Sequence, residues 1–162
     1  DYIPAVEKGV RNAANSGVVA GFPVVDVAVM LTDGSSHSVD SSGMAFEIAA
    51  SMGFRQAVRE ARPTLLEPVM NLRIITPDDC AGDVMSDLST RRAQIGGMES
   101  KGNGVTEIIA VAPASTMQRY AADLRSLTHA RGDFTAIMDH YEPLPAQEAS
   151  KVIASRQSSE DE

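Results

Sequence analysis

The run Val69-Met70-Asn71-Leu72-Arg73-Ile74-Ile75-Thr76-Pro77-Asp78-Asp79 decides the fold of the second half of the chain, because it predicts a strand followed by the start of a helix. Its first seven residues, 69–75, are typical of a strand. In the remainder, the proline suits a first helical turn and the two acids suit the positive end of a helix. The run therefore predicts a strand that leads directly into a helix.

The same pattern occurs twice in tandem. Gly102-Asn103-Gly104 marks a turn, and the strand-like segment after it again ends at a proline, Pro113, that opens a helix. Two strand–helix–strand units in tandem give the βαββαβ order of a ferredoxin-like sandwich, an α+β fold in which two helices cover one antiparallel sheet. The expected elements are a helix to about residue 92, strands over 93–99 and 105–112, a helix over 113–128 and a strand over 133–141.

The first third of the chain predicts a helix, one strand and a second helix. Pro4 suits the first turn of a helix over 4–16. Residues 22–32 alternate apolar side chains as a strand does. After a polar loop of small residues, a second helix is expected over 42–61. Its expected inward-facing residues are Met44, Ala45, Ile48, Ala49 and Met52.

A helix–strand–helix segment is not a closed structural unit. A lone strand leaves its backbone donors and acceptors without a ladder. We therefore expect the partner strands of 22–32 either upstream of Asp1 in a longer protein or from another copy of this chain. The sequence begins at Asp1, without Met, and its first pattern is already a helix, as expected for a fragment.

Composition favours a folded protein with an aliphatic core. Of the 162 residues, 43% are hydrophobic and only 4% are aromatic. The single cysteine, Cys80, excludes an internal disulfide and fits a reducing compartment. No apolar run approaches the roughly 18 residues of a membrane span, and no secretory signal is present. We therefore expect a cytoplasmic protein.

The net charge of −8 disfavours nucleic-acid binding through a broadly basic surface. Local patches can still oppose the net charge. Arg91 and Arg92 are adjacent, and Arg119, Arg125 and Arg131 follow at roughly helical spacing. Two interpretations stay open for these residues, a solvated helix face or contacts with RNA in a large assembly.

The sequence contains no pattern typical of a catalytic site. It has no phosphate-binding loop and no dinucleotide fingerprint. His37, His129 and His140 are too dispersed to predict a metal site. Cys80 lies near a helix start, where the dipole would lower its pKa, but nothing in the sequence places a base beside it. We expect no enzyme activity, metal or cofactor in this chain.

Several runs resemble one protein family, in the same order and at the same spacing. The main runs are Tyr2-Ile3-Pro4-Ala5-Val6-Glu7-Lys8-Gly9, Gly21-Phe22-Pro23-Val24-Val25-Asp26-Val27, Asp33-Gly34-Ser35-Ser36-His37-Ser38-Val39-Asp40-Ser41-Ser42, Arg91-Arg92-Ala93-Gln94-Ile95 and Tyr120-Ala121-Ala122-Asp123-Leu124-Arg125-Ser126. Together the runs cover residues 2 to about 145, and they resemble the fourth and fifth domains of bacterial elongation factor G.

The resemblance implies a domain organisation. Residues 1–67 would be the C-terminal α-β-α part of domain IV, a ribosomal-protein-S5-domain-2-like domain whose earlier strands are not in this chain. Residues 68–143 would be domain V, which is ferredoxin-like in the family. Beyond the matched runs, the residue pattern itself predicts a C-terminal helix and a disordered acidic tail over 144–162, with fraying expected over 158–162. GTP and Mg²⁺ would bind in an N-terminal domain outside this chain.

The resemblance also implies partners and site residues. In the family, domain IV reaches the decoding centre of the small ribosomal subunit, where its tip loops touch tRNA and mRNA. The loop 33–42 matches one tip loop, and its expected contact residues are Gly34, Ser35, His37, Ser41 and Ser42. Domain V would lie against large-subunit RNA and the stalk base, with Arg91, Arg92 and Arg125 as candidate contacts. The implied function is promotion of tRNA–mRNA translocation during protein synthesis.

Some positions depart from the family pattern. Ser36 replaces a common Tyr, Gly43 replaces a common Glu, and Gln118-Arg119 replaces a Phe-Gly. Two alternatives therefore stay open. One is a paralogue of the family that is specialised in ribosome recycling. The other is a ferredoxin-like binding module that does not act on the ribosome.

Overall fold

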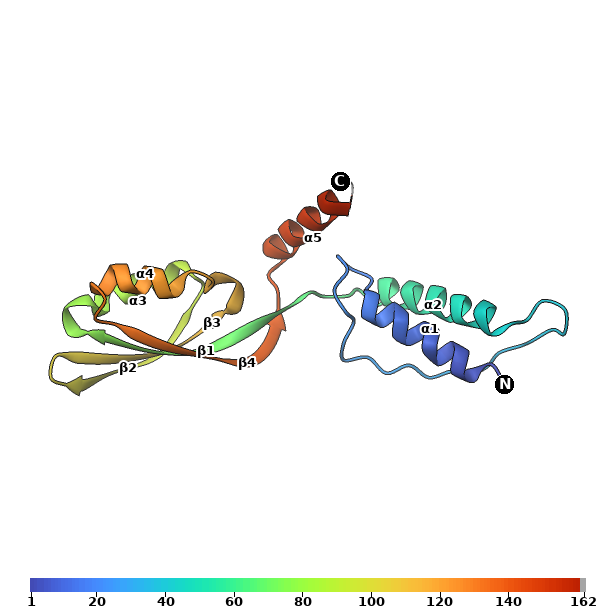
Figure 1. The fold of residues 1–162 in the computed structure, drawn as a ribbon, viewed down its shortest axis with the longest axis horizontal. Helices are drawn as coiled ribbons and strands as arrows, with labels where there is room; N and C mark the ends of the chain where they lie inside the picture. The colour runs from blue at the N-terminus through green and yellow to red at the C-terminus, as the bar shows by residue number, and fades with distance from the viewer. Residues whose placement is uncertain (161–162) are drawn as a thin grey trace. The chain divides into compact units, whose positions relative to one another are not determined.

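The tandem repeat forms one four-stranded antiparallel sheet in the computed structural model, which describes residues 1–160 and side chains to residue 157. The order across the sheet is β2-β3-β1-β4, so the first strand of each repeat lies in the centre (Figure 1). The predicted ferredoxin-like sandwich is thereby confirmed. The strands are β1 (Leu66–Pro77), β2 (Gln94–Gly102), β3 (Val105–Pro113) and β4 (Asp133–Pro143).

Two helices cover one face of this sheet (Figure 1). Helix α3 (Ala81–Thr90) follows a 3₁₀ turn over Asp78–Cys80, and α4 (Tyr120–Thr128) follows a 3₁₀ turn over Ala114–Thr116. Alternate side chains of the central strands point at the helices, because successive residues of a strand face opposite sides. The buried core is aliphatic apart from one tyrosine: Leu72, Ile74, Val84, Leu88, Ile108, Ala110, Ala112, Tyr120 and Leu124.

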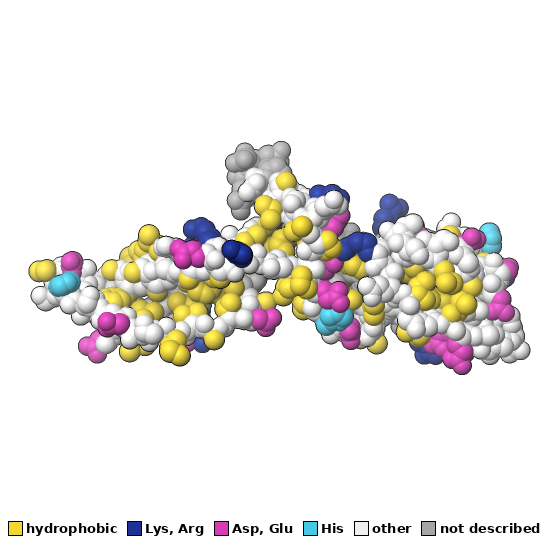
Figure 2. Space-filling model, turned by 180° about the vertical axis from the view of Figure 1, so that it is seen from behind, with side chains coloured by type: hydrophobic (Ala, Val, Ile, Leu, Met, Phe, Trp, Pro, Cys, Tyr) yellow, Lys and Arg dark blue, Asp and Glu magenta, His cyan; other side chains and the backbone are white. Residues whose placement is uncertain are grey.

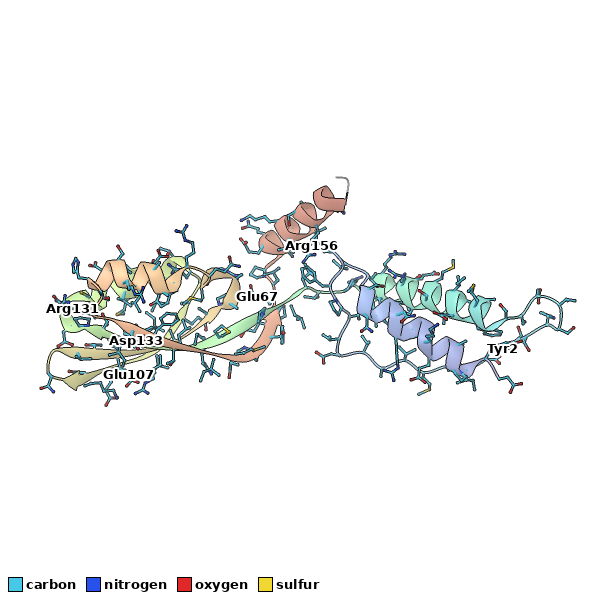
Figure 3. All side chains as sticks on the ribbon, in the orientation of Figure 1. Tyr2, Glu67, Glu107, Arg131, Asp133 and Arg156 are labelled. Carbon is cyan, nitrogen blue, oxygen red and sulfur yellow. The ribbon has the colours of Figure 1, made fainter. Side chains whose placement is uncertain are left out.

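The first 65 residues and the segment from Pro145 onward form a separate unit from Leu66–Leu144. The predicted division between residues 67 and 68 thus falls inside β1. Helix α5 (Ala146–Glu160) belongs to this first unit, where the Arg156 guanidinium lies 4.7 Å from the centre of the Phe22 ring (Figure 3). The last residues of the predicted frayed end, 161 and 162, lie outside the described residues.

Helices α1 (Ile3–Ser16) and α2 (Gly43–Glu60) pack against each other in the first unit. They lie close together at Gly9, where a Cβ atom would overlap the backbone carbonyl of Glu47. Gly17 ends α1 at φ +78°, a conformation that favours glycine. Both predicted helices are therefore present, and no helix of the described residues is long and apolar enough to cross a membrane.

Residues 22–32 do not form the predicted strand. The segment has no ladder, because the described residues hold no strand that could pair with it. Its backbone also turns at Asp26, where φ is +56°. The apolar side chains that suggested a strand are all more than half exposed, and hydrophobic atoms gather on the surface of this unit (Figure 2). They are Val25, Val27, Val29 and Leu31.

The predicted inward face of α2 is also wrong. Met44, Ile48 and Met52 are 74%, 53% and 67% exposed, and Ala45 and Ala49 are exposed as well. Helix α2 has two apolar stripes, and α1 covers the other one, on which Phe54 is buried. Helical periodicity identifies both stripes but does not say which of them meets a neighbouring element.

Candidate nucleic-acid interface

The loop 33–42 is shaped by short side chains that bond to its own backbone. The Gly34 amide donates to the Asp33 carboxylate at 2.7 Å. The His37 amide donates to the Ser41 hydroxyl at 2.8 Å, and the Ser41 amide donates to the His37 carbonyl at 3.2 Å. Ser42 caps α2, accepting from the Ala45 amide at 3.1 Å. The loop therefore holds a defined turn ahead of the positive end of an 18-residue helix.

The predicted tip residues lie together in this loop. Gly34, Ser35, His37 and Ser42 are exposed, and Ser41 is half-buried. The His37 imidazole has no hydrogen-bond partner within residues 1–157, the part of the chain whose side chains the structure describes. The arrangement can present an uncharged donor or acceptor and several small side chains to a ligand at close range.

The base of the loop has support that the sequence did not suggest. The rings of Tyr2 and Phe46 stack at 4.4 Å between centroids, with an interplanar angle of 9°. The Tyr2 hydroxyl, labelled in Figure 3 at the start of α1, donates to the Ser41 carbonyl at 3.4 Å. In the sequence, this contact is signalled by Tyr2 just before α1 and by Phe46 in the first turn of α2.

Arg91 is held inside the sandwich unit, and 13% of its side chain is exposed. It contacts the Asp87 carboxylate at 2.8 Å, the Asp123 carboxylate at 2.6 Å and the Thr116 carbonyl at 2.7 Å. Its guanidinium carbon lies 5.0 Å from the centre of the Tyr120 ring. The hydrogen bonds that Arg91 donates to Asp87 raise the pKa of Arg91 further above its usual value. These contacts tie α3 to α4 and use most of the donors of the guanidinium.

Arg92 is also engaged within the protein. Its two terminal nitrogens contact the two Glu67 carboxylate oxygens at 2.9 and 2.8 Å. Glu67, labelled in Figure 3 near the start of β1, is 7% exposed, whereas the Arg92 side chain is 35% exposed, so the carboxylate is shielded from water and the guanidinium is partly solvated. Arg92 has φ +59°, which turns the chain out of α3 toward β2. The adjacent arginines therefore point to different partners and do not form one basic patch.

Arg125 lies on the exposed side of α4. Its guanidinium makes no ion pair or hydrogen bond with any side chain among the described residues, and the same holds for the exposed Arg119 just before the helix. The surface of α4 beside them carries the small residues Ala121, Ala122 and Ser126. A flat helix face with two uncompensated positive charges can approach an anionic backbone closely.

The predicted lowering of the pKa of the Cys80 thiol is wrong. Burial, followed by the neighbouring Asp79 carboxylate, raises the pKa of its thiol instead of lowering it. The thiol is 5% exposed and lies 3.5 Å from a terminal nitrogen of Arg131, which also bonds Asp79 at 3.1 Å. Cys80 is the N-cap of α3, and burial together with the Asp79 charge outweighs the effect of that helix end. Within the described residues, no group of three or more His, Cys, Asp or Glu is placed to hold a metal ion.

Tyr120 leads to a stability prediction, because its hydroxyl is buried without a hydrogen-bond partner among the described residues. Burial raises the pKa of this phenol. An unsatisfied buried hydroxyl costs free energy, so Tyr120→Phe should raise the free energy of unfolding by about 1 kcal/mol. Urea unfolding would measure the change. Tyr141→Phe, at a 60% exposed position, is the matched control and should change it by less than about 0.5 kcal/mol. A loss of stability in Tyr120→Phe would mean that the hydroxyl is bonded in solution.

Comparison with known proteins gives consistent matches along the chain. The family model for elongation factor G, domain IV matches residues 1–62, and the model for the elongation factor G C-terminus matches residues 64–152. Elongation factor G of Aquifex pyrophilus is 49% identical over 156 residues, which are 96% of this chain and 22% of that protein. A crystal structure of a protein from Thermus thermophilus matches with a TM-score of 0.84 and 39% identity, over 97% of this chain and 24% of its own. The chain therefore spans less than a quarter of the length of these relatives.

Proposed function

Because this chain belongs to the elongation factor G family, we propose that it is the ribosome-engaging C-terminal part of a translational GTPase that promotes tRNA–mRNA translocation. The family resemblance inferred from the sequence is confirmed by the two matching models. The same matches favour neither the recycling paralogue nor a non-ribosomal binding module. GTP hydrolysis, with GTP and Mg²⁺, belongs in this proposal to a domain outside the chain, and the whole protein would work in the cytoplasm.

The exposed turn around His37 is the observation that carries the proposal. Its backbone is fixed by Ser41 and Asp33, while the imidazole is left without an internal partner in the described part of the chain. A neutral imidazole can bond a ribose 2′-hydroxyl or a phosphate without the cost of burying a full charge. We assign to this loop, with Gly34, Ser35, Ser41 and Ser42, the contact with the tRNA–mRNA pair in the decoding centre.

The arginines divide into two roles in this proposal. We assign to Arg125 a contact with large-subunit RNA near the stalk base, and this is supported by its exposed guanidinium, which makes no ion pair among the described residues. Arg91 and Arg92 act on the same contact indirectly, by fixing α3, α4 and β1 around it. The net charge of −8 does not oppose this assignment, because screening at physiological salt limits the range of the distant charges to about 8 Å.

Co-sedimentation of the chain with ribosomes at two salt concentrations tests the proposal. We expect salt-sensitive binding by the unmodified chain, a loss of about tenfold in affinity for Arg125→Ala, and a weaker loss for His37→Ala. Arg59→Ala is the matched control, because Arg59 is an exposed helix arginine remote from the tip loop along α2. Binding that is equal in all three variants would contradict the assigned contacts. Absence of binding by the unmodified chain at low salt would contradict the proposed role of this chain.

A further inference from the structure

The two end segments of the sandwich unit form a two-stranded ribbon. Leu66 pairs with Pro143, Glu67 with Glu142, and Val69 with His140, while β3 pairs with β1 only from Val69 onward. Residues 66–68 are therefore held in the sheet by β4 alone. The chain enters this unit at Leu66 and leaves it at Leu144, so the ribbon contains both points of connection to the first unit.

The ribbon carries an unfavourable pair of charges. Glu67 and Glu142 lie directly opposite each other on antiparallel strands, and paired residues of such strands point to the same face. Like charges in this position destabilise strand pairing. Arg92 compensates Glu67 through its two-pronged contact. Glu142 depends on a different partner, His140 on its own strand.

The imidazole of His140 contacts a carboxylate at each nitrogen. Nδ1 lies 2.6 Å from an Asp139 oxygen, and Nε2 lies 2.7 Å from a Glu142 oxygen. An ionised carboxylate can only accept, and a neutral imidazole carries a single N–H. Both contacts can be hydrogen bonds at the same time only if the ring is protonated. The geometry of His140 is therefore that of an imidazolium.

We propose that His140 is a proton-dependent clasp that keeps the end of β4 paired with the start of β1. On its own strand the ring contacts Asp139 and Glu142. His140 pairs with Val69 across the ribbon, so by register its diagonal neighbour is Glu67, which Arg92 contacts. With the proton in place, the imidazolium and the Arg92 guanidinium offset two of the three negative charges that the nearby carboxylates carry. Without it, the three carboxylates face only the Arg92 guanidinium, and the ends of the ribbon separate more often.

The direction of the pKa shift sets the pH range of the clasp. The hydrogen bonds that the ring donates to Glu142, and then those to Asp139, raise the pKa of His140 above its ordinary value of 6.5. A raised folded-state pKa means that the stabilisation is complete below 6.5 and is lost as the pH rises through the folded-state value. The ribbon should therefore be more protected below pH 6.5 than above the folded-state pKa of His140.

Two measurements on the complete chain test the clasp. NMR titration of the histidine ring protons, assigned with His140→Gln, should give His140 a pKa above 6.5. Hydrogen exchange of residues 66–69 and 140–143, corrected for intrinsic rates, should rise several-fold between pH 6 and pH 9. His140→Gln should show fast exchange that is independent of pH in this range, and Glu142→Gln should weaken the dependence.

A matched variant separates the clasp from general effects of pH. His129 is the other exposed histidine of the sandwich unit, and His129→Gln should keep the response of the ribbon unchanged. A His140 pKa at or below 6.5 would overturn the proposal. The proposal would also be overturned if hydrogen exchange of residues 66–69 and 140–143 in the unmodified chain did not change with pH.

Discussion

Replacing Gly9 by alanine is expected to separate α1 from α2 and to lower the free energy of unfolding of the first unit by about 3 kcal/mol. Gly9 is buried where the two helices lie close together. An added Cβ would overlap the Glu47 carbonyl oxygen and lie 3.1 Å from the Glu47 Cα atom. These are backbone atoms, which cannot rotate away, so the helices must move apart. The movement would also disturb the contacts of Glu47 with Lys8 and Asn12.

Gly53→Ala is the matched control for this change. Gly53 also lies inside a helix, but it is exposed and a Cβ atom there would meet nothing within 4 Å. Helix propensity alone predicts that both substitutions stabilise the protein, by about 1 kcal/mol. Hydrogen exchange of peptides from α1 and α2 would measure each effect. We expect opposite signs, and a stabilising Gly9→Ala would show that the helices do not pack closely in solution.

The sequence predicted the sandwich because local and long-range signals agree there. The run 69–79 and its repeat, which begins at Val105 and reaches a helix start at Pro113, each combine a strand pattern with a helix start, and the resulting elements bury one another. The first unit differs because its segments do not bury one another completely. Residues 22–32 have the alternation of a strand, but a strand requires a partner, and none lies in the described chain.

The exposed loop that carries the candidate tip residues was predictable from the sequence, whereas the internal contacts of the arginines were not. The loop around His37 could be located because polar, small residues between two periodic segments predict an exposed loop. The roles of Arg91 and Arg92 could not be read from their adjacency. Whether an arginine is free depends on carboxylates distant in sequence, here Asp123 and Glu67, which only the fold brings near.

Arg91→Ala is expected to lower the free energy of unfolding of the sandwich unit by about 2 kcal/mol, whereas Arg125→Ala should leave it within about 0.5 kcal/mol. Removing the Arg91 guanidinium leaves the Thr116 carbonyl without its donor and Asp87 without its counter-ion. The expected loss is smaller than that for breaking a fully buried ion pair. The Asp123 side chain is 45% exposed, so water can partly replace the lost contact. Urea unfolding midpoints would give both changes.

Arg91→Lys decides whether charge or geometry matters at this position. A lysine keeps the positive charge but cannot bond Asp87, Asp123 and Thr116 at once, since its ammonium is a single point of contact. We therefore expect Arg91→Lys to lose most of the stability that Arg91→Ala loses. Full stability in both Arg91 variants, together with weakened ribosome binding, would make Arg91 a direct RNA contact. The opposite pattern, with Arg125→Ala stable but weak in binding, would assign the contact to α4 and leave Arg91 as the residue that holds α3 and α4 in place for it.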